Sequence, residues 1–305
     1  MRIGVLSFRP LDKQATPEEL ALKNSAKELG HKSRIFRATK FQLVYDTESP
    51  WLLYDGKPFP DYDVVITRPS VLKDVDLHIA LLEQMEMSGI LLFNKYQSIL
   101  NAKNKIRTMQ ILDRFGIPIP KTVIIRRPED VVQASKLVGG FPAIVKTPFG
   151  SFGNGVTIVE SMRGLNSFLR WDQPGYLLQE FVKYSRGKDI RIFVVNGKIA
   201  GAMMRSAKKG EFRSNIELGG IGTTVEITNE ESNIALRSVQ ALGLDYGGVD
   251  VIRSKEGPVV LEVNSNPGFK ELERSTGISI AKSIVEYAIE LADRQKRLMF
   301  THVSQ

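Results

Sequence analysis

Three oxygen-bearing side chains late in the chain have a spacing that suits a metal site. Asp250 lies in one predicted strand, residues 248–253, whereas Glu262 and Asn264 lie in the next, residues 258–264. A short turn joins these strands as antiparallel neighbours. Because side chains alternate between the two faces of a strand, the three are predicted to share one face. Two carboxylates and an amide carbonyl suit a small hard cation such as Mg²⁺ that arrives bound to a nucleotide.

The competing interpretation of this ribbon is the solvated face of an edge hairpin. The sequence Asn-Ser-Asn-Pro-Gly at 264–268 counts against that interpretation. An apolar strand that delivers Glu and Asn directly into an Asn-Pro-Gly turn is a rarer arrangement than an acidic edge hairpin. We therefore expect a metal site, with the phosphates of a nucleotide beside it.

A lysine at the mouth of a glycine-rich loop predicts phosphate binding. Lys146 closes the predicted strand 143–147, and the loop that follows contains Gly150, Ser151, Gly153 and Gly155. Glycines allow several backbone N–H groups to point into one concavity that binds phosphate oxygens, and such a loop can close as a lid. The alternative is an ordinary glycine-rich hairpin beside a solvated lysine.

Groups for a base and a sugar occur next along the chain. The segment Gln-Glu-Phe-Val at 179–182 ends a predicted strand, so its backbone could meet an adenine edge, with Phe181 and Val182 as apolar walls. Asp189 begins the following strand, where a carboxylate can accept hydrogen bonds from ribose hydroxyls. The competing interpretation of 179–182 is a core strand.

Basic side chains surround these candidates. Arg191 shares the face of Asp189 by the two-residue strand period, and Lys105 lies early in a predicted helix, where its local signal is weak. Guanidinium groups further along could hold carboxylate or phosphate oxygens. Arg205 on the partner strand and Arg213 beyond it carry these groups, and the polar residues Ser214 and Asn215 follow as further candidates. A solvent-exposed face of ion pairs is the competing interpretation.

Composition excludes several kinds of chemistry. The 305 residues are 42% apolar and 25% charged, which indicates a globular chain of two or three domains. The absence of cysteine removes disulfides, thiolate zinc sites and cysteine nucleophiles. The three histidines, His31, His78 and His302, are far apart in sequence, so a Ser-His-Asp hydrolase is disfavoured.

Charge and hydropathy narrow the partners. A formal net charge of +8 favours anionic partners, and basic residues dispersed among polar ones fit a phosphate site better than a nucleic-acid arm. No apolar run approaches the ~18 residues of a spanning helix, and the opening apolar run is too short for a secretory signal. We expect a cytoplasmic protein without membrane contact or direct nucleic-acid readout.

The elements that must position these residues fall into three stretches. Residues 1–95 alternate strand and helix signals, which predicts a small βαβ domain with a parallel sheet. Its first turn lacks Gly-x-Gly-x-x-Gly, and no Walker sequence occurs, so dinucleotide-binding and P-loop enzymes are disfavoured. The predicted strands of this stretch are 3–6, 33–37, 64–67 and 91–93, with helices at 17–29 and 76–87.

A second stretch opens with a predicted helix at 101–115 and continues with strands and helices in alternation. The strands are expected at 122–125, 143–147, 156–160 and 176–179, and the helices at 128–138 and 162–171. The last third begins with a hairpin turned at Asn196-Gly197, a strong turn signal. Its elements are strands 190–195, 199–204 and 223–227, a helix at 229–242, the metal ribbon and a helix at 279–297.

The order of these motifs resembles that of the ATP-grasp ligases. Within them the chain is similar to the RimK-type family, which attaches glutamate to the C-terminus of the sixth small-subunit ribosomal protein. The most discriminating segments are Lys-Lys-Gly-Glu-Phe-Arg-Ser-Asn at 208–215 and Asn-Ser-Asn-Pro-Gly at 264–268. The likeness extends over nearly the whole chain.

The resemblance implies a mixed fold, α/β and α+β. An N-terminal pre-ATP-grasp domain (1–95) would precede a central lid subdomain (96–182) and a C-terminal antiparallel-sheet subdomain (183–305). It implies that Lys105 and Lys146 contact ATP phosphates. It also implies that Glu180 and Phe181 contact the adenine and that Asp189 contacts the ribose. Arg213, Ser214 and Asn215 would lie at the nucleotide and acceptor end. Two Mg²⁺ or Mn²⁺ ions would be held by Asp250, Glu262 and Asn264.

The implied reaction joins L-glutamate to the C-terminal carboxylate of an acceptor through an acylphosphate. Arg191 and Arg213 are the candidates for a catalytic arginine near the developing charge, and a homo-oligomer, dimer or tetramer, is implied as well. The lid departs from the acidic Glu-Gly-Thr-Gln-Gly style of the ribosomal-protein ligases, because Phe149 and Phe152 stand in it.

Two kinds of alternative stay open at this point. A ligase of the same architecture could act on another acceptor: a pterin or deazaflavin coenzyme tail, a free poly-glutamate chain, or the acidic carrier protein of lysine biosynthesis. A non-catalytic nucleotide- or ribosome-binding protein is the alternative from another class.

Overall fold

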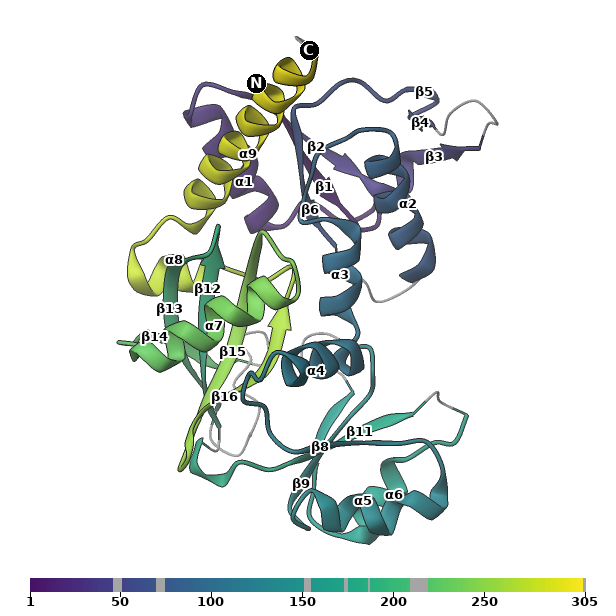
Figure 1. Ribbon diagram of the computed structural model, residues 1–305, viewed down its shortest axis with the longest axis vertical. Helices are drawn as coiled ribbons and strands as arrows, with labels where there is room; N and C mark the ends of the chain where they lie inside the picture. Colours follow the sequence, from purple (N-terminus) through teal and green to yellow (C-terminus); the bar gives the residue numbers. More distant parts are fainter. Residues whose placement is uncertain are drawn as a thin grey trace.

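A computed structural model describes residues 1–45, 51–69, 75–150, 155–172, 175–185, 187–208 and 219–303. In this part of the chain the strands form four sheets. Figure 1 shows an N-terminal unit at the top, a central unit at the bottom and a long antiparallel sheet beside and between them. Predicted sites at Ser151, Gly153 and 213–215 lie outside the described residues.

The N-terminal unit is built on a parallel sheet, as predicted. Its strands are β1 (Arg2–Ser7), β2 (Lys32–Arg37), β6 (Val64–Arg68) and β7 (Leu92–Phe93), in the order β2-β1-β6-β7. Alternation along β1 separates two cores: Ile3 and Val5 pack toward α1 (Pro17–Glu28), and Leu6 packs toward α2 (Val75–Met87).

A small antiparallel sheet on this unit was not predicted. It consists of β3 (Phe41–Val44), β4 (Trp51–Tyr54) and β5 (Lys57–Pro58), preceded by a 3₁₀ turn, η1 (Ala38–Lys40). Aromatic rings from this sheet surround Phe36 in edge-to-face contacts. The strands are two to four residues long, too short for a two-residue period to stand out.

The helix predicted at 101–115 is two helices. A single residue, Asn104, separates α3 (Tyr96–Lys103) from α4 (Lys105–Arg114), because its backbone is extended. The Asn104 side chain accepts hydrogen bonds from the N–H groups of Ile106 and Arg107, which caps α4. The break places Lys105 at the first position of a helix.

The central unit is an antiparallel sheet covered by helices on one face. β8 (Thr122–Ile125), β9 (Ala143–Lys146), β10 (Val156–Val159) and β11 (Tyr176–Glu180) have the order β10-β9-β11-β8. The helices α5 (Val131–Leu137) and α6 (Met162–Phe168) share one core with the sheet, and η2 (Pro128–Asp130) leads into α5. Figure 1 shows both helices together below the sheet.

The C-terminal unit is a five-stranded antiparallel sheet. Its order is β14-β13-β12-β15-β16, from β12 (Lys188–Val195), β13 (Lys198–Ser206), β14 (Ile221–Thr224), β15 (Tyr246–Ser254) and β16 (Gly257–Asn264). The predicted Asn196-Gly197 turn is confirmed, since both residues have positive φ, +52° and +62°. The 3₁₀ turn η3 (Lys183–Ser185) leads into this sheet.

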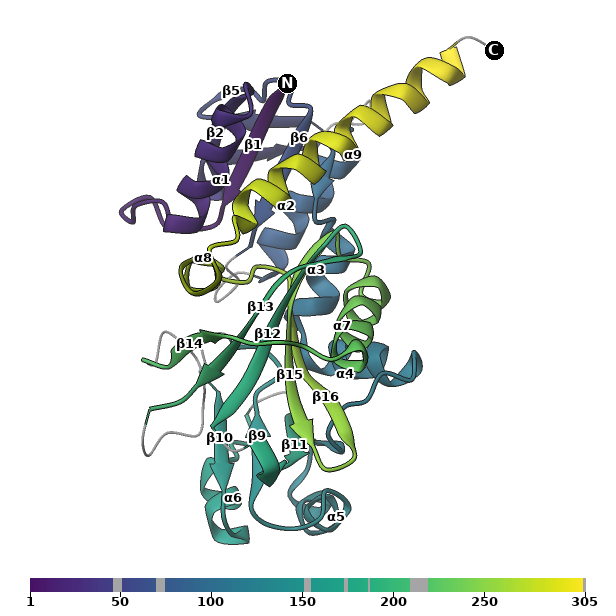
Figure 2. The same cartoon turned by 90° about the vertical axis from the view of Figure 1, so that its left-hand side faces the viewer.

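Helices cover both faces of this sheet. α7 (Asn229–Ala241) packs on one face, where Ile234 and Val239 meet β12 and β15. α8 (Lys270–Thr276), which was not predicted, and α9 (Ile280–Val303) pack on the other. Figure 2 shows that α9 then crosses beside α1 and extends past the N-terminal sheet.

One hydrophobic core crosses from the N-terminal unit to the C-terminal sheet. Phe93 of β7 packs in the same cluster as Phe193 of β12 and Tyr246 of β15. Asn94 is buried beside them: its amide oxygen accepts from the N–H groups of Asp245 and Tyr246, and its Nδ2 donates to the carbonyls of Tyr246 and Ser265. Asn94 therefore joins the two units through a shared interior. The two predicted domain boundaries, after residues 95 and 182, stay predictions.

No helix in the described part of the chain is long and apolar enough to cross a lipid bilayer.

Candidate active site

The predicted metal ligands come together on the β15–β16 ribbon. Asp250 and Glu262 are cross-strand partners, and the ladder bulges directly after Asp250. Asn264, two residues after Glu262, donates from Nδ2 to Oδ2 of Asp250 at 3.4 Å. Among the described residues no three His, Asp or Glu side chains are grouped to hold a metal, and the metal role of Asp250, Glu262 and Asn264 stays a prediction.

Asp250 is part of a buried ion cluster, which we define as Asp189, Arg191, Arg205 and Asp250. Arg191 donates from Nε and Nη2 to the two oxygens of Asp250, the second contact being 2.9 Å. Arg205 donates from Nε and Nη2 to Asp189 at 2.6 and 2.7 Å, and its Nη2 lies 3.0 Å from Asp250 Oδ2. Each of these four residues is less than 10% exposed.

The charges of this cluster balance, two against two. Burial raises the pKa of Asp250, but the adjacent guanidinium groups of Arg191 and Arg205 outweigh it, and the pKa is lowered from its usual value. Burial lowers the pKa of Arg205, and the carboxylates of Asp250 and Asp189 outweigh that effect, so the pKa is raised. The cluster therefore keeps Asp250 ionised, as a metal ligand must be.

The cluster changes the interpretation of the arginines. From the sequence, Arg205 was a candidate for holding ligand oxygens and Arg191 for a catalytic arginine, whereas in the structure both guanidinium groups hold protein carboxylates. The register explains the pairing, because Asp189 lies opposite Arg205 and Arg191 lies opposite Asp250. A catalytic role for Arg191 and a ribose contact for Asp189 stay predictions.

Lys105 forms hydrogen bonds with the start of the glycine-rich loop. Its N–H donates to the carbonyl of Pro148 at 3.0 Å, and its Nζ donates to the carbonyl of Gly150 at 2.8 Å. The residue is 8% exposed, so Lys105 is a buried lysine, which its weak local signal in the sequence did not show. The break at Asn104 directs this side chain across to the central unit.

The base of the same loop is closed by Thr147 and Gly155. The N–H of Thr147 donates to the carbonyl of Gly155 at 2.8 Å, and Thr147 Oγ1 donates to the carbonyl of Phe149 at 2.7 Å. Gly155 has φ +72°, and a Cβ there would lie 2.1 Å from Thr147 Oγ1. Only glycine fits this position, so the loop leaves and rejoins the sheet in a fixed geometry.

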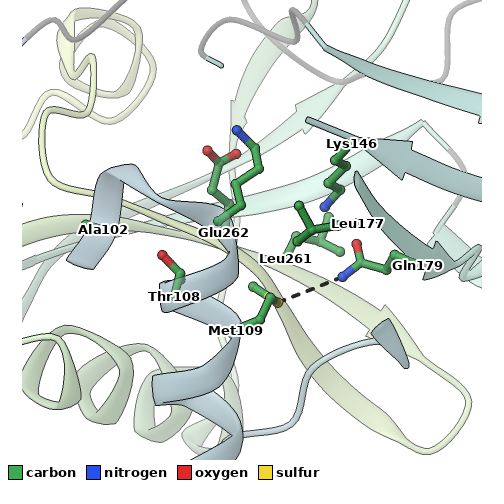
Figure 3. A pocket seen from close by; sticks show the side chains of 9 residues that line it. Ala102, Thr108, Met109, Lys146, Leu177, Gln179, Leu261 and Glu262 are labelled. Carbon is green, nitrogen blue, oxygen red and sulfur yellow. Dashed lines mark hydrogen bonds between the residues drawn. The ribbon is translucent and has the colours of Figure 1, made fainter. Parts of the chain in front are cut away.

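A cavity lies between α4, the central sheet and the metal ribbon (Figure 3). Lys146 and Glu262 border it on opposite sides, and Gln179 borders it from β11. Gln179 is buried and donates to Thr122 Oγ1 at 2.9 Å, so it belongs to the wall. The remaining lining residues are Ala102, Lys105, Thr108, Met109, Leu177 and Leu261.

The predicted adenine segment leaves the sheet at the edge of this cavity. β11 ends at Glu180, whose N–H donates to the carbonyl of Lys121 at 2.9 Å. Phe181 and Val182 follow, and both are half-buried. Of residues 179–182, only Gln179 is buried as the alternative of a core strand requires. The contact of residues 180–182 with an adenine stays a prediction.

Burial changes the pKa of Lys146, which lines this cavity, and that of Lys103, which lies in range of Glu262 and Lys105. Burial lowers the pKa of Lys146 to about 8, with the carboxylate of Glu262 opposing the shift and the ammonium of Lys105 adding to it. Burial also lowers the pKa of Lys103 to about 8, again against Glu262, and the charges of Arg68 and Lys105 add to the lowering. Lys103 was not among the predicted site residues, because helical spacing does not indicate which charges a buried lysine faces.

Comparison with known proteins identifies the architecture. Residues 102–288 match the RimK-like ATP-grasp domain, and residues 1–99 match the RimK PreATP-grasp domain. The chain belongs to the RimK-like ATP-grasp family. The ATP-grasp ligase fold expected from the sequence is thus confirmed, including the N-terminal pre-ATP-grasp unit and the antiparallel sheets.

Relatives of this RimK-like ATP-grasp ligase cover nearly its full length. A probable alpha-L-glutamate ligase 1 from Shewanella sp. (strain W3-18-1) is 35% identical over 300 residues, 97% of this chain and 98% of that protein. A probable alpha-L-glutamate ligase from Coxiella burnetii (strain Dugway 5J108-111) is 36% identical over 291 residues, 94% and 95% of the two chains.

A solved structure shares the fold at lower identity. The ATP-grasp ligase PsnB, complexed with a phosphomimetic variant of a minimal precursor, Mg and ADP, superposes with a TM-score of 0.72. It is 19% identical, and the match covers 95% of this chain and 98% of that one.

Proposed function

We propose that this RimK-like protein adds L-glutamate to the C-terminal carboxylate of an acceptor in an ATP-dependent reaction. The observation that carries the proposal is that Lys105, Lys146 and Glu262 line one cavity in a chain of this family, with Asp250 beside Glu262 as its cross-strand partner. The two curated relatives named alpha-L-glutamate ligase support the choice of amino acid.

ATP would occupy the space between the central sheet and the C-terminal ribbon. Lys105 and Lys146, with the glycine-rich loop, would hold its phosphates, and Glu180 to Val182 and Asp189 would meet the nucleoside. The Mg- and ADP-bound state of the fold neighbour PsnB supports this class of ligand. The contacts expected from Ser151, Gly153 and Arg213 to Asn215 complete the proposal and lie outside the described residues.

The donor set fits Mg²⁺, and Mn²⁺ by the same oxygen chemistry. An ionised carboxylate has about four acceptor positions. The Asn264 amide nitrogen lies 3.4 Å from Oδ2 of Asp250, and the two arginines use three positions, two on Oδ2 and one on Oδ1, which leaves a fourth position open on Oδ1. A metal would take that fourth position, with Asn264 turning its oxygen inward and Glu262 adding the second carboxylate. When bound, the metal ions would neutralise charge on the phosphates.

The chemistry needs alignment and charge neutralisation. The γ-phosphoryl group of ATP moves to the acceptor carboxylate, which gives ADP and an acylphosphate; the glutamate amine then attacks the acyl carbon and expels phosphate. The ammonium groups of Lys105 and Lys146 would balance phosphate charge during transfer. No covalent enzyme intermediate is required, which agrees with a chain that has no cysteine.

A ribosomal small-subunit protein is the acceptor that we propose, in a homo-oligomeric enzyme. The support is the motif order and the family. Phe149 is 43% exposed at the start of the glycine-rich loop, so an apolar side chain stands where acceptor chains would approach. The acidic-tailed peptides that test the proposal should therefore include one with an apolar residue near its acidic end.

The test is ADP release by purified protein with ATP, Mg²⁺, glutamate and an acidic-tailed peptide. We expect the peptide mass to rise by whole glutamate increments. Lys146→Ala should weaken ATP binding strongly, whereas Lys136→Ala, at an exposed helical lysine of the same unit, should not. ATP binding without ADP release in the presence of ribosomal proteins, poly-glutamate, coenzyme tails or carrier proteins would instead favour the non-catalytic alternative.

A further inference from the structure

Arg68 is a buried cation whose hydrogen-bonding capacity is only partly used. It is the last residue of β6 and is 5% exposed. Its Nη1 donates to the carbonyl of Pro267 at 3.1 Å, and its guanidinium lies 5.5 Å from the centre of the Phe269 ring. Its Nε is buried and donates to no partner in the described structure. An unpaired buried donor costs about 1–3 kcal/mol, so a role is expected for it.

The loop opposite Arg68 carries two more polar atoms of this kind. Ser265 Oγ and Asn266 Oδ1 are buried, and the described residues give them no hydrogen-bond partner. The loop is held firmly, because Asn266 Nδ2 donates to the carbonyl of Pro69 at 3.1 Å while Arg68 donates to Pro267. These reciprocal bonds bring residues 68–69 and 265–267 side by side.

The fold places this pair of segments where open parallel sheets bind ligands. In the order β2-β1-β6-β7, β1 is followed by its neighbour on one side, β2, and β6 by its neighbour on the other side, β7. The topological switch point therefore lies between β1 and β6. Ligands of such sheets bind at the carboxyl ends of the strands at this point. Ser7 of β1 is the register partner of Arg68, and Arg9, two residues further, has another buried Nε that meets no hydrogen-bond partner among the described residues.

The electrostatics connect this place to the phosphate end of the site. The charge of Arg68 acts on Lys103, which also lies in range of Lys105 and Glu262. Gly248, two residues before Asp250, packs so closely under Pro267 that a Cβ would lie 2.7 Å from the proline ring. The loop that faces Arg68 thus rests directly on the metal ribbon.

We propose that Arg68, Ser265 and Asn266 form the subsite for the amino-acid substrate, with Arg68 and Ser265 holding its carboxylate and Asn266 Oδ1 accepting from its amine. The proposal rests on the proposed ligase function. The chemistry favours an amino acid over a simple anion, because the unused atoms include a charged donor, a hydroxyl and an acceptor together.

Two variants test the subsite through the kinetics of glutamate. Arg68→Gln should raise the KM for glutamate by about 30-fold or more while the affinity for Mg-ADP changes by less than about twofold. Ser265→Ala removes an atom that bonds no described protein group, so its melting temperature should equal that of the wild type. Its KM for glutamate should nevertheless rise by roughly tenfold. Arg163→Gln, at an exposed arginine of α6, is the matched control.

The same kinetics distinguish whether the bound carboxylate belongs to the amino-acid substrate or to the acceptor. With a glutamate oligopeptide as acceptor, a rise in the KM of the peptide alone would assign the subsite to the acceptor and overturn the assignment to the amino-acid substrate. Unchanged KM values in Ser265→Ala and in a folded Arg68→Gln would show that Arg68 only ties the two units together.

A binding measurement keeps this result independent of turnover. Calorimetry of glutamate with the Mg-ADP complex of the full chain should show binding that Arg68→Gln and Ser265→Ala weaken. γ-Aminobutyrate, which lacks the α-carboxylate, should bind more weakly than glutamate. If the wild type binds glutamate in this manner without forming product, the ligase function fails and the subsite stands; if turnover is normal and these variants have no effect, the subsite fails alone.

Discussion

Replacing Asp250 by Asn should destabilise the protein, although this residue is also a proposed metal ligand. The carboxylate is 4% exposed and accepts two hydrogen bonds from Arg191 and an ion-pair contact from Arg205. Asp189 still compensates Arg205 in the variant, so Arg191 becomes the buried guanidinium without a carboxylate. Removing one partner of a buried pair typically costs about 3–5 kcal/mol. At about 2–4 °C per kcal/mol, the melting temperature should fall by roughly 6–20 °C.

The assay is thermal unfolding without metal or nucleotide, so ligand binding does not contribute. Glu262→Gln, the other proposed carboxylate ligand, is half-buried, and its melting temperature should stay within about 2 °C of the wild type. Asp113→Asn, at an exposed position of α4, controls for the substitution itself. A melting temperature for Asp250→Asn that is unchanged or raised would refute the claim that the buried ion cluster stabilises the sheet.

The remaining predictions concern the ligand. Glu262→Gln should abolish Mg²⁺-dependent ADP release with the fold retained, and unchanged turnover would remove the metal assignment. ATP affinity should be constant below pH 8 and fall above it, because Lys146 loses its positive charge as the pH rises through its pKa of about 8; in Lys146→Arg, calorimetry should show a flatter profile, and an identical decline would exclude Lys146 as the cause. Gly155→Ala should weaken ATP binding more than Gly139→Ala, since both have positive φ but only Gly155 lacks space for a Cβ; equal effects would count against the loop geometry.

The sequence predicted most long elements because their patterns are local. The Asn196-Gly197 turn is determined by adjacent residues, and the parallel sheet of the first stretch was predicted from strand and helix patterns that each lie within one element. The prediction of a single helix at 101–115 was wrong because the apolar spacing that indicated it begins at Ile106, after Asn104, whose side chain caps the second helix. β3, β4 and β5 depend on packing around Phe36, which no short window contains.

The candidate site was predictable to the extent that strand register could be inferred. Asp250 and Glu262 belong to adjacent strands joined by a short turn, so their pairing followed from the sequence. The ion cluster depends on three strands and on a pairing between Asp189 and Arg205, across a hairpin whose register shifts at Phe193. Arg68 meets Pro267 across 199 positions of sequence, and no local pattern indicates such a contact.

The buried bonds of Asn94 have a consequence for exchanging parts between relatives. This side chain holds Asp245, Tyr246 and Ser265 of the C-terminal sheet, while α9, the last helix, packs against α1. A chimera that takes only residues 1–99 from a homologue would therefore cut through a common interior. An exchange that includes α8 and α9 together with the first 99 residues would keep α1 and α9 matched. The two ends of the chain should therefore be exchanged together.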